Sequence, residues 1–169
     1  MKAKIEPEPW LRGTLTEVPA VTRAVLHALE LAREDVERWC EDLNDAELNA
    51  RELGLPSVTQ QVRHIAGSID RLLTYAEGSQ LSEAQLTVLK AEAAPVSREA
   101  LFGDFRAAMD EAARRVRSFA LSRFEDARSV GRKQLPTTVG GLLVHVADHT
   151  QRHVGQLVTT VKVIIAKRS

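Results

Sequence analysis

Apolar side chains recur every three or four residues in four separate segments of this chain. This spacing gathers them on one face of an α-helix, whereas a half-buried β-strand needs strict alternation. We therefore expect long helices over residues 18–43, 57–76, 97–121 and 137–166, and a shorter helix that begins at residue 82 and fades before Pro95. Because each apolar stripe must pack against another to leave water, the helices are expected to form a bundle.

The segments between the long helices constrain their connections. About a dozen residues around Gly54 and Pro56 join the first two helices, which is enough for an antiparallel pair. About 20 residues join the second and third, long enough for a crossover that leaves them parallel. A connection of that length is often functional or lines the mouth of a site. The sequence therefore predicts an all-α fold, a four-helix bundle with a long crossover, as a single domain over residues 1–169.

Charge and composition exclude several classes of partner. The chain has 23 acidic and 23 basic residues and no block of like charge, so we expect neither nucleic acid nor membrane as a partner. Its single cysteine, Cys40, allows no internal disulfide and fits a reducing cytoplasm. The first residues lack the apolar core of a signal peptide, and no apolar stretch reaches bilayer length. The expected location is the cytoplasm.

A histidine ladder in the last helix is the main candidate for chemistry. The run His145-Val-Ala-Asp-His149-Thr-Gln-Arg-His153 holds three of the five histidines, spaced four apart on one helical face. Imidazole is the commonest metal ligand among side chains. The outer two histidines lie about 12 Å apart along the axis, whereas metal–nitrogen bonds are about 2 Å long. The ladder therefore supplies a pair of ligands, and a third must come from elsewhere.

The position of each histidine on its helix indicates which pair would bind. Relative to an apolar stripe centred on Val146, His153 is expected to be buried, His149 to lie on the shoulder, and His145 at the margin. This favours His149 and His153 as ligands and leaves His145 as a neighbouring or surface group. The side chains of Gln156 and Arg152 fall on the same side and are candidates to face a ligand.

The second helix carries a matching polar flank. His64 lies there with Gln61, Ser68 and Tyr75, beside an apolar stripe. If this flank faced the ladder, three imidazoles would converge in a cleft. The remaining histidine, His27, has no polar stripe around it and is expected to be structural.

Simpler interpretations compete with metal binding. A lone histidine on an apolar flank is more often a hydrogen-bonded structural residue than a ligand, and histidine pairs four residues apart also occur in helices by chance. The side chains of Gln156, Arg152 and Tyr75 are most simply solvated or packing groups. Cys40 is most simply a small core residue.

Several segments together resemble a known family. The segments are Glu8-Pro-Trp-Leu-Arg-Gly13, Arg63-His-Ile-Ala-Gly67, Asp70-Arg-Leu-Leu-Thr-Tyr-Ala-Glu-Gly78, Val130-Gly-Arg-Lys-Gln-Leu-Pro-Thr-Thr138, His145-Val-Ala-Asp-His149 and Arg152-His-Val-Gly-Gln156. Over nearly its whole length the chain resembles the DinB/YfiT-like family of metal-binding four-helix bundles. The histidine pair followed by Gly-Gln is the most specific of these signals.

The resemblance carries expectations about the site and the assembly. It implies that His64, His149 and His153 bind one divalent cation, and that the helices run up-down-down-up. It also implies frequent homodimers. Members with a known activity are thiol transferases and a thiol-dependent isomerase, which use low-molecular-weight thiols such as bacillithiol or mycothiol.

Three functions remain open at this stage. The first is a metal-dependent S-transferase that joins a low-molecular-weight thiol to a small electrophile, with Gln156, Arg152 or Tyr75 orienting either reactant and the catalytic base unknown. The second is a non-catalytic, stress-related metal-binding module. The third is a metal-dependent hydrolase, which the expected solvent-facing position of Asp148 makes less favoured. For the metal, Zn, Ni or Fe suits an imidazole site.

Overall fold

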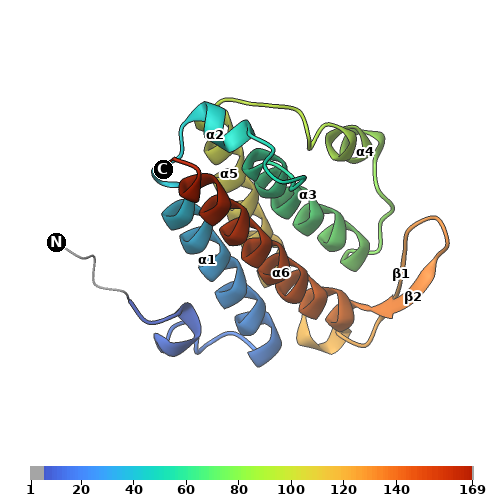
Figure 1. Ribbon diagram of the computed structural model, residues 1–169. Coiled ribbons are helices and arrows are strands. Elements are labelled where there is room, and N and C mark those ends of the chain that lie inside the picture. The colour runs from blue at the N-terminus through green and yellow to red at the C-terminus, as the bar shows by residue number, and fades with distance from the viewer. Residues whose placement is uncertain (1–5, 169) are drawn as a thin grey trace.

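The computed structural model describes residues 6–168, and most of them are helical. Figure 1 shows long helices packed side by side. These are α1 (Ala20–Cys40), α3 (Val58–Ala76), α5 (Arg98–Arg117) and α6 (Val139–Ala166). The shorter elements are η1 (Pro9–Leu11), α2 (Asp45–Asn49), α4 (Glu83–Lys90), η2 (Leu121–Arg123), β1 (Ala127–Val130) and β2 (Leu135–Thr138). The predicted helical class is confirmed.

A small antiparallel hairpin, which the sequence did not predict, accompanies the helices. Strands β1 and β2 pair from Ala127 with Thr138 to Val130 with Leu135. They protrude beside the bundle, before α6 (Figure 1). The turn between them needs left-handed backbone at Gly131 and Gln134, with φ values of 70° and 50°. Strands of four residues are too short for a clear alternation of apolar and polar side chains, so the pattern did not predict them.

The helix ends also differ from the predicted ones. Helix α1 begins at Ala20 because Pro19 has extended backbone, with ψ of 146°, and it ends at Cys40 rather than at residue 43. Helix α5 ends at Arg117 rather than at residue 121. The connection after α1 contains the unexpected helix α2, where the side chains of Asn44 and Glu47 form a capping box.

The core lies where the long helices face one another. Helix α6 packs against both α1 and α3, and α3 also packs against α5. Cys40 is fully buried within this core, and burial raises the pKa of its thiol to about 12, so the thiol is an inert packing group. The ring of His27 is buried too, with Nε2 3.1 Å from the Thr14 hydroxyl, which fits the expected structural role. Within residues 6–168 no helix is long and apolar enough to cross a membrane.

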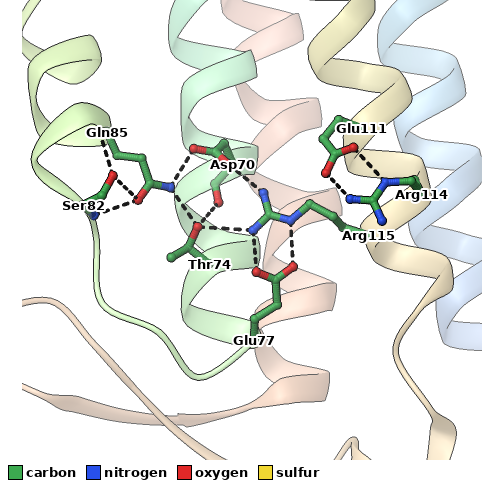
Figure 2. Close-up of polar contacts among 8 residues, drawn as sticks. All are labelled: Asp70, Thr74, Glu77, Ser82, Gln85, Glu111, Arg114 and Arg115. Carbon is green, nitrogen blue, oxygen red and sulfur yellow. Dashed lines mark hydrogen bonds and ion pairs between the residues drawn. The ribbon is translucent and has the colours of Figure 1, made fainter.

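A polar network ties α3 to α4 and α5 at one side of the bundle (Figure 2). The guanidinium of Arg115 donates to Asp70 at 2.6 Å and to both carboxylate oxygens of Glu77 at 2.7 and 2.9 Å. The amide of Gln85 on α4 donates to Asp70 at 2.7 Å and to Thr74 at 2.8 Å. No residue of α4 is buried, so these polar contacts contribute much of its attachment to α3.

We predict that Arg115→Met lowers the free energy of unfolding by about 1–2 kcal/mol, because it removes hydrogen bonds to two carboxylates that water can partly replace. Chemical denaturation measures the change. The matched control is Arg114→Met, since the guanidinium of Arg114 is exposed and bonds Glu111 within its own helix. No measurable loss is expected there. Equal effects of the two substitutions would contradict a special role for the network.

Candidate metal centre

Three histidine rings converge from two helices that are far apart in sequence. His64 comes from α3, and His149 and His153 come from α6. One ring nitrogen from each lies within 4.8 Å of the other two. The ring centroids are 4.5 Å apart for His64 and His153, 4.4 Å for His149 and His153, and 5.7 Å for His64 and His149. All three rings are partly buried, so they line an accessible site. We call them the histidine trio.

The register of α3 against α6 places the trio. Ser57 caps the start of α3, and its hydroxyl accepts from the backbone N–H of Gln60 at 3.1 Å. One turn further on, the side-chain amide of Gln61 donates to the Thr160 hydroxyl of α6 at 2.8 Å. This bond fixes the two helices next to the point where His64 reaches α6.

Hydrogen bonds select which nitrogen two of the rings offer. Nδ1 of His64 lies 2.8 Å from a carboxylate oxygen of Glu92, and Nδ1 of His153 lies 2.8 Å from the amide oxygen of Gln156. Both oxygens only accept, so each Nδ1 carries the proton and each Nε2 keeps its lone pair. A metal-binding histidine typically has such a partner on its other nitrogen, which holds the ring in place and raises its basicity.

Glu92 reaches His64 from the crossover between α3 and α5. Its carboxylate is buried and also accepts from Arg71 of α3 at 2.8 Å. The guanidinium of Arg63 donates to the carbonyls of Ala91 and Ala94, which anchors this segment on α3. Burial alone would raise the pKa of Glu92, but the hydrogen bonds from His64 and Arg71 outweigh it and leave that pKa below its usual value. The carboxylate is therefore ionised at neutral pH.

A glycine makes room for this arrangement. A Cβ at Gly67 would lie 2.7 Å from Arg71 Nη1 and 2.8 Å from Glu92 Oε1. Contacts this short require a neighbour to shift, so a side chain at residue 67 would displace the ion pair that holds His64.

The electrostatics of the trio favour neutral imidazoles. Burial, followed by the charges of His153, His145 and His64, lowers the pKa of His149 from 6.5 to about 4. Burial and the neighbouring His64 also lower the pKa of His153. Metal binding requires the unprotonated ring, so protons compete weakly for these two ligands near pH 7.

The other predicted site residues lie in different surroundings. His145 is exposed, with its ring 5.2 Å from that of His149 and its Nδ1 3.5 Å from Asp148. The exposed Arg152 donates to Asp148 at 2.9 Å. Gln156 contacts the site through His153. Tyr75 lies three turns along α3 from His64, about 16 Å at 1.5 Å per residue, and lines a separate hollow beside β1.

The predicted burial of His153 needs correction. His153 is partly exposed rather than buried, because Thr150 and Val154 are both buried and shift the centre of the buried face of α6 away from the histidines. Sequence reasoning also missed Glu92 and Arg71. The length of the crossover suggested that this segment is functional, but nothing in the sequence distinguished Glu92 from the other acidic residues of the crossover.

Comparisons with known proteins bear on the fold and the family. A family model described as the DinB superfamily matches residues 28–157, which include the trio, Glu92 and Gln156. The chain belongs to the DinB superfamily. The chain is similar to a conserved protein from Enterococcus faecalis, known from a crystal structure, with 23% identity and a TM-score of 0.70. The similarity covers 86% of this chain and 98% of that one, and it concerns the fold. No curated protein matches the chain.

The donor set of this DinB-superfamily chain fits a divalent transition metal. Three imidazole nitrogens, two of them oriented by acceptors on the far side of the ring, match a catalytic type of site that leaves positions open to water or substrate. The trio therefore could hold a metal ion, with Glu92 and Gln156 as the groups that orient its ligands.

We predict that Glu92→Gln weakens binding of Zn²⁺ or Ni²⁺ by about 10- to 100-fold, because His64 loses the charged acceptor that orients its ring. Calorimetric titration measures the dissociation constant. As a control, Glu83→Gln removes an exposed carboxylate from the same crossover and should leave affinity unchanged. An unchanged affinity for Glu92→Gln would show that the carboxylate does not support a metal ligand.

The metal-free protein should lose stability as the pH falls from about 6.5 to about 4. Over this range unfolded His149 binds a proton that the folded ring does not, so acid favours unfolding. The contribution is fully present above pH 6.5 and lost below about pH 4. Denaturation at a series of pH values with chelator present measures it, and His149→Gln should flatten the slope. An equally steep slope in that variant would contradict the assignment.

Proposed function

We propose that this protein is a metal-dependent S-transferase, which joins a low-molecular-weight thiol to a small electrophile. The observation that carries the proposal is the histidine trio, with ligand nitrogens within 4.8 Å of one another on an accessible face. A divalent ion there would lower the pKa of a bound thiol and stabilise the resulting anion. His64, His149 and His153 would hold the ion.

The carboxylates near the trio favour a thiol over water as the nucleophile. Among residues 6–168, Glu92 and Asp148 are the carboxylates that contact histidine rings of this face. Glu92 is already bonded to His64 and Arg71, and Asp148 is exposed and paired with Arg152. Neither is placed as a free general base. A thiol has a pKa of about 8.5 and water about 15.7, so the thiol needs far less help to ionise.

The reaction balances without a redox partner. A sulfur–carbon bond forms, the bond to the leaving group breaks with its electron pair, and the thiol proton goes to solvent. Gln156 holds the ring of His153 through its amide oxygen. Arg152 is exposed one residue from His153 and is our candidate for attracting an anionic leaving group. We assign no role to Tyr75, because of its distance along α3.

Some wider properties belong to the same proposal. The up-down-down-up order is supported by Gln151 bonding to Ala28 and by Lys162 stacking on Trp39, which indicate that α1 and α6 run in the same direction. Gln61 contacts Thr160, and His64 lies beside His153, which precedes Thr160, so α3 and α6 run in opposite directions. A homodimer and a cytoplasmic location are proposed from the family resemblance and the composition.

The test combines metal analysis with activity. Protein without a histidine tag is expected to carry about one divalent ion, since three imidazoles form one site. His64→Ala should abolish that stoichiometry, whereas His145→Ala should retain it. Metal-loaded wild type, assayed with a panel of thiols and electrophiles, should form thioethers that the chelated protein and His64→Ala do not form.

Two results would change the assignment. No thioether with any pair, together with a large fall in melting temperature on chelation, would indicate a structural metal module instead. Metal uptake that survives His64→Ala would show that the trio is not the binding site.

A further inference from the structure

A fourth histidine extends the trio along α6 toward solvent. His145 precedes His149 by about one helical turn, and the centroids of the two rings lie 5.2 Å apart. This separation falls inside the range of 4.4 to 5.7 Å found between the rings of the trio itself. Two histidines four residues apart on a helix can bind one cation, so His145 and His149 form a second candidate pair of ligands. We call them the entry pair.

The ring of His149 belongs to both groups of ligands. It contacts the rings of His64 and His153 on one side and that of His145 on the other. The other two members of the trio are each held by an acceptor on Nδ1, whereas none of the hydrogen bonds among residues 6–168 involves the His149 ring. His149 is therefore free to present its lone pair to either group.

The two groups cannot each hold an ion at the same time. A neutral imidazole has one nitrogen with a free lone pair, so His149 binds either in the trio or in the entry pair. Positions midway between successive histidines of the ladder lie about 6 Å apart along the axis, at 1.5 Å per residue. Three ligands bind more tightly than two, so the trio is occupied at equilibrium and the entry pair is vacated.

Exposure favours His145 as the first ligand that a hydrated ion meets. The side chain of His145 is 46% exposed, compared with 30% for His64. On the α3 side the trio is covered by Glu92 and Arg71, whose side chains are 8% and 11% exposed. An ion must exchange its water for imidazole one ligand at a time, and this exchange is easiest where the first ring is surrounded by solvent.

The charges beside His145 do not oppose a cation. The guanidinium of Arg152 would repel one on this face, but it donates to Asp148 at 2.9 Å, which compensates its charge. The same carboxylate lies 3.5 Å from Nδ1 of His145. The approach to the entry pair is therefore electrostatically open.

We propose that His145 is the entry ligand of the metal centre. His145 and His149 bind the incoming divalent ion first, each replacing a water molecule. His149 then keeps the ion while His64 and His153 bind it and His145 leaves. The proposal rests on the part of the proposed function that places the metal at the trio, and it does not depend on S-transfer.

A ligand that acts only during transfer changes rates and leaves the equilibrium alone. His145 contacts the ion in neither the free nor the final state, so His145→Ala should leave the dissociation constant and the stoichiometry unchanged. Uptake and release should both slow by about tenfold, because the entry pair presents the ion to the remaining ligands at a high effective concentration.

Stopped-flow mixing of metal-free protein with Co²⁺ measures uptake through the visible absorption of the bound ion, and excess chelator measures release. The matched control is Val144→Ala, which alters an exposed neighbour that has no coordinating atom and should leave both rates unchanged. Both positions are exposed, so the melting temperature of the metal-free variants should match that of the wild type.

Three results would overturn the entry role in distinguishable ways. Equal rates in wild type and His145→Ala would show that His145 takes no part in transfer. A raised dissociation constant with an altered cobalt spectrum would make His145 a permanent ligand instead. If wild type bound no Co²⁺ at all, the trio would fail as a metal site and the entry role would fail with it.

A second experiment isolates the entry pair. The double variant His64→Ala/His153→Ala retains His145 and His149, and millimolar Ni²⁺ should broaden the NMR resonances around residues 145–149. Adding His145→Ala should remove that broadening. Binding by two ligands is too weak to survive purification, so it differs from the stoichiometric uptake that the trio provides. Broadening that persists without His145, or that lies elsewhere, would contradict the entry pair.

Discussion

The buried carboxylate of Glu92 connects the fold of this protein to its candidate chemistry. It accepts from His64 and from Arg71, and Glu92 is the one buried residue of the crossover, residues 77–97. Its negative charge is tolerated because two α3 side chains donate to it. The crossover is thus held against α3 by the same contact that orients a candidate metal ligand. Displacing the crossover would leave His64 without its acceptor and Arg71 without its counter-ion.

The trio is arranged to favour a metal over protons. Three rings with centroids 4.4 to 5.7 Å apart cannot all be charged without strong repulsion, and partial burial adds to that cost. A divalent ion would be attracted instead, by three lone pairs and by the nearby charge of Glu92. A bound ion would join α3 to α6, so metal binding would add to the stability of the fold.

The features that depend on helical periodicity could be predicted from the sequence. Apolar spacing located the long helices, and the wheel positions selected His64, His149 and His153, which the structure brings together. It did not predict the hairpin, whose strands are four residues long, or the identity of Glu92. Glu92 acts through a contact between the crossover and α3, and such contacts depend on tertiary packing. The exposure of His153 was misjudged because Thr150 and Val154 interrupt the expected polar–apolar pattern.

The register of α3 on α6 links the trio to a pocket one turn away, which is lined by Leu55, Pro56, Gln61, Gln156, Thr159 and Thr160. The bond from Gln61 to Thr160 aligns the two helices, and one turn later the same alignment brings His64 to His149 and His153. Gln156 contacts both places, since its oxygen holds His153 and its side chain lines the pocket. A ligand that engages the Gln156 amide would therefore also affect the orientation of a metal ligand. In this geometry, occupation of that pocket and the orientation of the His153 ring would be coupled through Gln156.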